Sequence, residues 1–374
     1  MSASGGSVNP AVQALLAEIA VAKLRAEQRR QAKAKADQQP YGVIKETNGA
    51  LVLRLPPPPP APAPSDCCHS GCTPCILDTY RDHLHAHNAE VAALQAQYQC
   101  ALLDDTGPLP EPRHHVLSHS LLNPLRFAAV RIIHAHSIGA RGRLLVLEAT
   151  AADFALAPGE HIHVRAQPGA VAKPITKPFT PVMIVAADGI VRPHLFVRLY
   201  ADHAMSAYLA NLSSGDQLAV RGPVSTPENM TRALSAPLCL LAAGGSGIAP
   251  IFQLLQFAHA NCAYRQTRIV LVHCAQDSES LWLRAQVAEM MVDMPALEYV
   301  AFLSEQPEQP EQPEQPEALE LRMVGARMSL DGIRWAVGGN VGAEAQAVVC
   351  GPGVFNQDVA RWLTELGFAG IQTL

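Results

Sequence analysis

The sequence predicts a multidomain α+β protein: a small Cys-rich helical module, an antiparallel β-barrel, and an α/β domain with a parallel sheet. Three observations support this. Cysteines and histidines cluster after a run of prolines, short alternating segments fill residues 122–234, and apolar strands alternate with helical periodicity over residues 235–374. Short alternating strands separated by turns are typical of antiparallel barrels, whereas strand–helix alternation is typical of parallel sheets.

Composition excludes several function classes. The chain has 374 residues, with 28 basic and 33 acidic side chains and a net charge of −5. No basic block is interleaved with aromatic residues, which argues against a nucleic-acid partner. No apolar run approaches the roughly 18 residues of a transmembrane helix, and the start of the chain does not resemble a secretory signal. Nine cysteines are too few for a disulfide framework in a chain this long. We therefore expect a cytoplasmic monomer, with mitochondria as the alternative compartment.

The first 120 residues divide into three expected segments. Residues 1–55 form a tail with a helix over 10–37, whose basic second half leaves contact with a membrane surface open. Residues 56–66 are a stiff polyproline linker, expected to isolate everything before it from the folded body. Residues 67–112 form the Cys-rich module, a turn running into a helix. Farther along the chain, the Glu-Gln-Pro repeat at 305–317 is expected to be a disordered insertion.

The barrel and the parallel sheet are each predicted from a series of elements. In the barrel the expected strands are 126–135, 143–149, 161–166, 182–187, 194–200 and 217–222, with one helix over 206–212. In the α/β domain, strands 238–243, 268–274, 297–303 and 345–350 are accompanied by helices 250–260, 280–291 and 355–366.

The segment Lys177-Pro178-Phe179-Thr180-Pro181-Val182 has the side chains that a flavin dinucleotide needs. An outward Lys177 can meet the pyrophosphate, Phe179 can lie along the ring, and Thr180 can hydrogen-bond to the reactive N5. Pro178 and Pro181 keep the strand extended, so that these groups alternate. An ordinary edge strand with a proline-flanked bend is the alternative interpretation.

A second element follows the strand 194–200. Ser206 is predicted to be the N-cap of a helix over 207–212. The exposed N–H groups at such a helix start form an anion site suited to the pyrophosphate. Simple capping without a ligand is the alternative.

Two further motifs indicate a nicotinamide site. Gly244-Gly245-Ser246-Gly247-Ile248-Ala249-Pro250 lies between an apolar strand and a helix, where glycines allow a cofactor to approach the backbone. Cys350-Gly351-Pro352 follows a second apolar strand. Acidic residues Asp277 and Glu279 after the second strand favour NADH over NADPH, although Arg284 keeps NADPH open.

From about residue 122 to the end, these motifs in this order resemble NADH–cytochrome b5 reductase, within the ferredoxin–NADP reductase superfamily. The resemblance implies an enzyme that passes hydride from NADH to FAD and single electrons to a haem protein such as cytochrome b5. It implies catalytic roles for Thr180 and for Cys350, which would aid orientation rather than act as nucleophile. The cofactor-binding residues it implies are Lys177, Pro178, Phe179, Thr180, Arg198, Tyr200, Ala204, Met205, Ser206, Gly244, Gly245, Ser246, Gly247, Pro250, Cys350, Gly351 and Pro352.

Three positions depart from the family pattern. Lys177 replaces an arginine and so loses its bidentate fork, and Leu374 stands where the family ends in an aromatic residue. His203 replaces a glycine, which would weaken flavin binding if the backbone there needs a positive φ.

The segment from Cys67 to Tyr80 resembles the short oxidoreductase-like N-terminal domain. Its chemistry stays open between zinc bound by Cys67, Cys68, Cys72 and Cys75, an iron–sulfur cluster with Cys100 as fourth ligand, and thiols that dock a partner or cycle through a disulfide. A rival to the enzyme hypothesis follows from this module. It is a catalytically weak or inactive flavoprotein-like scaffold that binds a partner or a metal through these cysteines.

Overall fold

The structure is a computed structural model, and it forms two compact units that are described separately. It describes residues 41–46, 50–63, 66–67, 74–103, 121–166, 174–186, 189–224, 230–261, 264, 267–305, 321–339 and 341–374. The helix expected over 10–37 and nearly all of the Glu-Gln-Pro repeat lie outside these residues. In the described part of the chain, no helix has the length and apolar character needed to cross a membrane.

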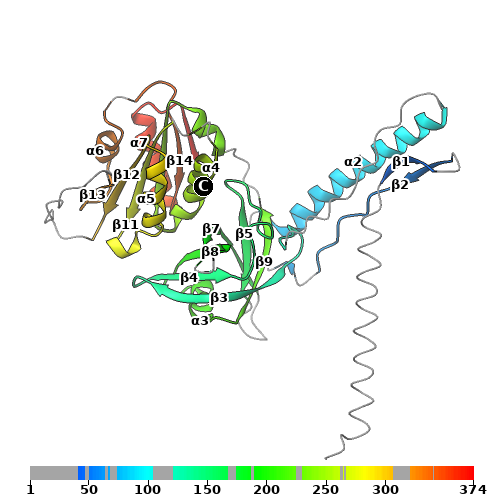
Figure 1. Ribbon diagram of the computed structural model, residues 1–374, viewed down its shortest axis with the longest axis horizontal. Helices are drawn as coiled ribbons and strands as arrows, with labels where there is room; N and C mark the ends of the chain where they lie inside the picture. The colour runs from blue at the N-terminus through cyan, green and yellow to red at the C-terminus, as the bar shows by residue number, and fades with distance from the viewer. Residues whose placement is uncertain are drawn as a thin grey trace, which may run out of the picture. The chain divides into compact units, whose positions relative to one another are not determined.

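The first unit combines a β-hairpin with one long helix (Figure 1). Strands β1 (Gly42–Lys45) and β2 (Leu51–Arg54) pair antiparallel, and helix α2 spans Ile76–Leu103. The Tyr41 hydroxyl donates to Glu90, and the Tyr98 hydroxyl donates to the carbonyl of Leu51, each at 3.3 Å. The hairpin was not predicted. These bonds join residues on both sides of the polyproline run, so residues 41–54 are not isolated as expected.

The second unit contains the predicted barrel, whose strands form a seven-stranded antiparallel sheet. The strand order is β6-β5-β9-β3-β4-β8-β7, so β6 and β7 are the two ends. Alternate side chains, among them Val130, Leu145 and Ile162, point into one buried core. The strands are β3 (Ala128–Ile138), β4 (Gly142–Leu147), β5 (His161–Ala166), β6 (Ile175–Phe179), β7 (Val182–Val185), β8 (Val191–Arg198) and β9 (Gln217–Val224).

Strand β6 lies at a sheet edge because of its proline. Pro178 has no backbone N–H to donate, so it is tolerated where one side of the strand has no partner strand. It pairs only with His163 of β5. The flavin-type motif therefore lies on an exposed strand edge, and only Thr180 and Pro181 separate β6 from β7.

The remainder of the second unit is the predicted α/β domain. Its parallel sheet has the order β13-β12-β11-β10-β14-β15, flanked by helices on both faces (Figure 1). Along β10, Cys239 and Leu241 pack into the core with α4 and α5, while Leu240 and Ala242 pack into the core with α6 and α7. The elements are β10 (Leu238–Gly244), α4 (Ile248–Ala260), β11 (Arg268–Ala275), α5 (Arg284–Asp293), β12 (Leu297–Leu303), β13 (Leu321–Val324), α6 (Leu330–Ala336), β14 (Gln346–Cys350), α7 (Gly353–Glu365) and β15 (Gly370–Thr373).

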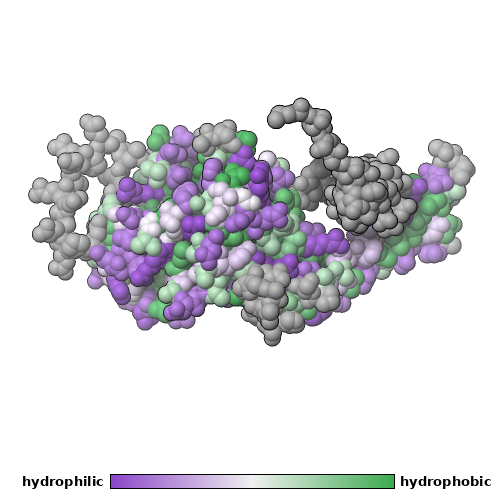
Figure 2. Space-filling model, turned by 90° about the horizontal axis from the view of Figure 1, so that it is seen from below, coloured by the Kyte–Doolittle hydropathy of each residue, from purple (hydrophilic) through white to green (hydrophobic). Residues whose placement is uncertain are grey.

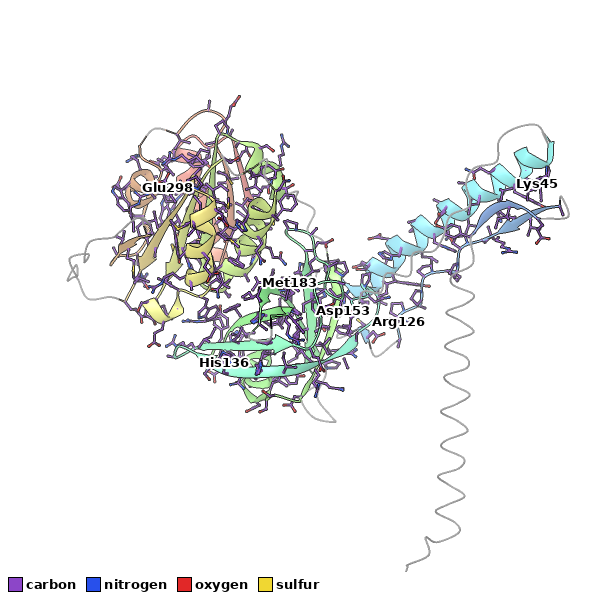
Figure 3. The ribbon with its side chains drawn as sticks, viewed as in Figure 1. Lys45, Arg126, His136, Asp153, Met183 and Glu298 are labelled. Atoms are coloured by element: carbon purple, nitrogen blue, oxygen red, sulfur yellow. The ribbon has the colours of Figure 1, made fainter. Side chains whose placement is uncertain are left out.

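One carboxylate ties three neighbouring strands of this sheet together. Glu298 of β12, labelled in Figure 3, accepts from Arg268 of β11 at 2.7 Å and from Arg322 of β13 at 2.9 Å. The short strand β13 is thereby held at the sheet edge. On the face seen in Figure 2, polar and apolar residues are interspersed over the described surface.

The strand order places a topological switch point between β10 and β14. From β10 the chain proceeds outward through β11, β12 and β13, then returns to the other side of β10 to form β14 and β15. In open α/β sheets, ligands bind outside the carboxyl ends of the strands at such a point. The two nicotinamide-type motifs begin at the carboxyl ends of β10 and β14, with Ala243 paired to Cys350.

Candidate active site

A cavity of about 610 Å³, here called the junction cavity, is lined by both the barrel and the α/β domain. The barrel contributes the edge strand β6 and the start of helix α3 (Ala204–Asn211), and the α/β domain contributes the glycine loop and the end of β14. The predicted site residues that line it are Lys177, Pro178, Phe179, Thr180, Arg198, Tyr200, Met205, Ser206, Ser246, Gly247, Pro250, Cys350, Gly351 and Pro352.

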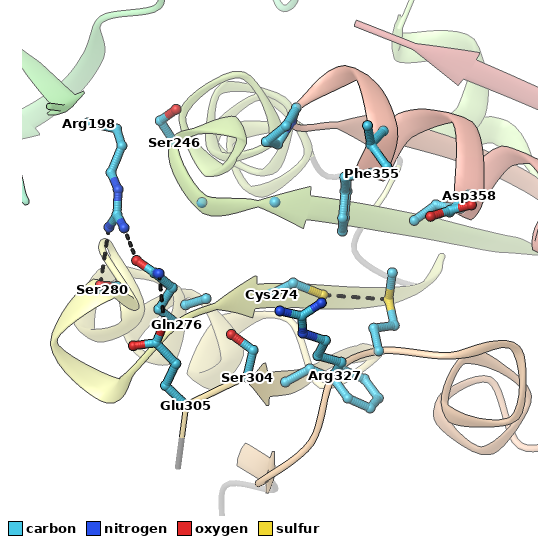
Figure 4. A pocket seen from close by; sticks show the side chains of 18 of the residues that line it. Arg198, Ser246, Cys274, Gln276, Ser280, Ser304, Glu305, Arg327, Phe355 and Asp358 are labelled. Atoms are coloured by element: carbon cyan, nitrogen blue, oxygen red, sulfur yellow. Dashed lines mark hydrogen bonds between the residues drawn. The ribbon is translucent and has the colours of Figure 1, made fainter. Parts of the chain in front are cut away.

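A second cavity of about 470 Å³, here called the strand-end cavity, follows the carboxyl ends of β10, β11 and β12 (Figure 4). It holds the remaining glycines of the loop, Gly244 and Gly245. Arg198, Tyr200, Ser246 and Pro352 line both cavities, so the two are adjacent. Of the predicted cofactor-binding residues, only Ala204 lines neither.

Gly247 and Gly351 lie where the glycine loop and the segment after β14 pack closely together, so that a side chain has no space there. A Cβ at Gly247 would lie 2.1 Å from the carbonyl oxygen of Cys350. One at Gly351 would lie 2.5 Å from the ring of Phe355 and 3.1 Å from the Cα of Gly244. A side chain at either position would displace the backbone that lines the cavities. Pro250 lies in the first turn of α4, where its missing N–H has no intrahelical partner to lose.

The predicted capping role of Ser206 is wrong. Helix α3 begins at Ala204 and its N-cap is His203, so Ser206 lies within the first turn. Its buried hydroxyl accepts a hydrogen bond from the Tyr200 backbone N–H at 3.0 Å. Ser206 therefore fixes the end of β8 against the helix. The N-cap makes no side-chain hydrogen bond to the helix, so the first N–H groups of α3 are open to an anion.

The backbone at His203 does not need glycine. Its φ is −103° and its ψ is 118°, which is ordinary extended backbone. The positive φ of this turn, 60°, falls one residue earlier at Asp202, a residue type that tolerates the left-handed region. The His203 side chain lines the junction cavity, and its ring lies 5.7 Å from that of Tyr200.

The cations of the site differ in how they are engaged. Lys177 is exposed at the cavity edge. Arg198 donates to the side-chain oxygen of Gln276 and, at 3.4 Å, to the hydroxyl of Ser280 (Figure 4). Arg198 thus connects the barrel to the end of β11.

Burial keeps the Cys350 thiol neutral. Desolvation raises its pKa to about 12. A thiol that stays protonated at neutral pH is a poor nucleophile. Cys350 lines the junction cavity, and its role in orienting a ligand stays a prediction.

The acidic residues that favoured NADH do not line either cavity. The Asp277 carboxylate accepts from the backbone N–H of Ser280 at 2.8 Å, and Glu279 lies beside Gly139 of the barrel. Arg284 does not line the cavities either. Sequence reasoning missed the residues that do line this region, including Gln276, Ser280, Ser304, Arg327 and Phe355. Only their places after strand ends could have indicated them.

The Cys-rich module is described only in part. Cys67 and Cys75 belong to the described residues, whereas Cys68 and Cys72 lie outside them. Among the residues that the structure describes, no three His, Cys, Asp or Glu side chains converge as metal ligands. Asp66, next to Cys67, forms an ion pair with Arg165 of β5 at 3.1 Å.

These features fit a flavin and a nicotinamide dinucleotide. The glycine loop and the end of β14 line the two cavities at the switch point, Phe179 offers an apolar wall, and Lys177 and the start of α3 offer positive charge. The barrel followed by a parallel sheet, with both motifs on one cavity, defines a flavin- and nicotinamide-dependent oxidoreductase.

Comparison with known proteins agrees with this class. The family models for the oxidoreductase FAD-binding domain, the oxidoreductase NAD-binding domain and the oxidoreductase-like protein N-terminal region match residues 130–228, 241–361 and 50–96. The chain belongs to the FAD- and NAD-binding oxidoreductases of the cytochrome b5 reductase type.

Curated relatives carry the same family name. The chain is 30% identical over 227 residues to an NADH-cytochrome b5 reductase-like protein of Homo sapiens, covering 60% of this chain and 66% of that one. It is 26% identical over 323 residues to the Mus musculus protein of that name, covering 86% and 95%. An NADH-cytochrome b5 reductase 1 of Dictyostelium discoideum is 25% identical, covering 56% of this chain and 67% of its own length.

Solved structures show the same fold. The cytochrome b5 reductase domain of Ulva prolifera nitrate reductase matches with a TM-score of 0.52 and 19% identity, covering 68% of this chain and 99% of that one. The CS-b5R domains of human Ncb5or in the NAD+ form match with a TM-score of 0.53 and 17% identity, covering 71% and 75%.

Proposed function

We propose that the protein oxidises NADH, with FAD as its bound cofactor, and delivers single electrons to a small haem protein such as a cytochrome b5. The observation that supports this most directly is the junction cavity, where β6 of the barrel faces the glycine loop and Cys350. The curated relatives are named for the same donor and acceptor. When bound, the flavin would supply the chemistry that side chains lack, accepting a hydride and releasing electrons singly.

The barrel residues would hold and orient the flavin. Lys177 and the open N–H groups of α3 would face its negative charge. The Phe179 ring would pack on an apolar part of the ligand, and the Thr180 hydroxyl would donate or accept a hydrogen bond. Since Thr180 immediately follows the edge strand β6, its backbone N–H is also free of ladder pairing.

The α/β residues would bring the nicotinamide to the same cavity. Gly247 and Gly351 let the glycine loop pack directly against the end of β14, and the neutral Cys350 thiol would lie beside the ligand without competing chemistry. Catalysis by such a site consists mainly of alignment of two bound rings. The metal status of the Cys-rich module has no part in this proposal.

Reduction of purified cytochrome b5, followed by haem absorbance with NADH and the FAD-loaded chain, tests the proposal. We expect haem reduction that requires both FAD and NADH. A chain that reduces ferricyanide but not cytochrome b5 would contradict the acceptor and keep the NADH–flavin reaction. A chain that reduces neither would contradict the proposed function.

A further inference from the structure

Arg327 lines the far end of the strand-end cavity. It lies between β13 and α6, and its side chain extends into the cavity beside Cys274 and Ser304 (Figure 4). Arg327 is exposed, and no carboxylate of the described residues lies within ion-pair distance of it. The N–H donors of the Arg327 guanidinium are therefore available to a ligand bound in the strand-end cavity.

The position of Arg327 along the sheet separates it from the nicotinamide end. The cavity runs from the ends of β10 and β14 past β11 to β12, and Arg327 follows the outermost strand, β13. Neighbouring strands lie about 4.8 Å apart, so the four spacings from β14, which ends at Cys350, to β13 correspond to about 19 Å. A dinucleotide with its nicotinamide at Cys350 would extend its adenosine half toward Arg327.

The other charged groups of the cavity are already engaged. Arg198 is bonded to Gln276 and Ser280. Glu305 accepts from the Gln276 amide at 2.9 Å, and Asp358 pairs with Arg361 at 2.9 Å. Arg327 is the cavity cation without such a partner among the described residues.

The end of β11 lacks the group that selects against a phosphorylated ribose. In dinucleotide sites an acidic residue after the second strand binds the ribose 2′-hydroxyl, whereas an arginine nearby accommodates a 2′-phosphate. Here Ala275, Gln276 and Ser280 line that position, while the Asp277 and Glu279 carboxylates lie outside the cavity.

We infer that Arg327, with the Ser304 hydroxyl, forms a subsite for the 2′-phosphate of NADPH. The protein then accepts NADPH as well as NADH. This inference rests on the proposed function, because it assigns a second donor to the same hydride reaction. Of the two carboxylates that line this cavity, Glu305 accepts from Gln276 and Asp358 pairs with Arg361.

Steady-state kinetics of the FAD-loaded chain with each nucleotide test the inference. Arg327→Ala is expected to lower kcat/KM for NADPH by about 10- to 100-fold, because a charge-assisted hydrogen bond is lost. It should change kcat/KM for NADH by less than about threefold. Arg334→Ala is the matched control, since this α6 arginine pairs with Asp331 and lies outside the cavity. If Arg327→Ala lowered kcat/KM equally for NADPH and NADH, the assignment of this subsite would be wrong.

A binding measurement separates the subsite from the reaction. By calorimetry, 2′-AMP should bind the parent chain more tightly than 5′-AMP, and Arg327→Ala should abolish that preference. Equal binding of the two, or a preference that survives Arg327→Ala, would overturn the inference even where NADH oxidation is normal. A chain that oxidises neither nucleotide but prefers 2′-AMP through Arg327 would contradict the proposed function and support the subsite.

Discussion

Gly247 and Cys350 bring two distant segments into direct backbone contact: a Cβ at Gly247 would lie 2.1 Å from the carbonyl oxygen of Cys350. The glycine loop after β10 and the end of β14 thus form one surface at the switch point. Both catalytic and structural consequences of this contact can be tested.

Gly247→Ala should disturb this surface. A clash with backbone cannot be relieved by a rotamer change, so we expect a loss of about 1–3 kcal/mol in the free energy of unfolding and weaker NADH binding. Gly353→Ala is the control, because a Cβ there would meet nothing within 4 Å. Thermal unfolding and the KM for NADH measure both effects. Wild-type behaviour of Gly247→Ala would show that the loop can move away from Cys350.

Lys177 should contribute to flavin affinity through its charge. Lys177→Ala is expected to raise the Kd for FAD by about tenfold, and Lys177→Arg should restore or improve it through a bidentate contact. Arg131→Ala removes a barrel cation that pairs with Glu148 outside the cavity, and should leave the Kd unchanged. Fluorescence titration of the apoprotein with FAD measures these values. Equal Kd values for FAD in all variants would show that Lys177 does not contribute to flavin binding.

His203→Gly should have little effect on flavin binding. Because φ at His203 is −103°, glycine would add backbone freedom without relieving strain. We expect the Kd for FAD to change by less than about threefold. A large gain in affinity would mean that the histidine ring obstructs the cavity.

Cys350→Ser should retain most activity. With its pKa raised to about 12 by burial, the thiol is neutral at every pH where the protein is assayed. We expect kcat within about tenfold of the parent, whereas loss of a nucleophile costs several orders of magnitude. Single-turnover reduction by NADH measures the step. A loss of that larger size would contradict an orienting role.

His163 should make the barrel sensitive to acid. Its ring is fully buried, and desolvation, Arg221 and His161 lower its pKa from the ordinary 6.5 to about 3. Between these values the unfolded chain binds a proton that the native state does not. The contribution of His163 to the free energy of unfolding is therefore fully present above pH 6.5. It is lost as the pH falls toward 3, with a slope approaching about 1.4 kcal/mol per pH unit.

Urea unfolding between pH 4 and pH 7 can measure this slope. His163→Leu should reduce the slope and leave the share of the buried His273, whose pKa burial also lowers to about 3, whereas the exposed His136→Leu should leave the slope unchanged. Parallel profiles for His163→Leu and the parent would place the acid sensitivity elsewhere.

Strong local patterns predicted the fold, and elements that depend on distant partners escaped prediction. Strands β5 and β12 have the predicted bounds, because each is an apolar or alternating run between turn residues. Strands β13 and β15 are four residues long and exist through pairing with β12 and β14. Helix α6 has seven residues with Gly332 inside it, a composition that carries little helical signal.

Among the site residues too, those with a local sequence pattern were predicted and those placed by distant parts of the chain were not. The motif residues were predicted because glycine, proline and cysteine leave a sequence signature, and they line the two cavities. Ser206 was misassigned because a serine before an apolar run has the pattern of an N-cap, whereas its hydroxyl binds the Tyr200 N–H. Arg327 has no local signature, because β13 brings it to the cavity.

An absorbance spectrum of the purified chain, recorded before and after anaerobic addition of NADH, tests the central claim most directly. We predict a flavin band, present on isolation or after addition of FAD, that NADH bleaches. A colourless protein that takes up no FAD, or a flavin band that NADH leaves unchanged, would contradict the account.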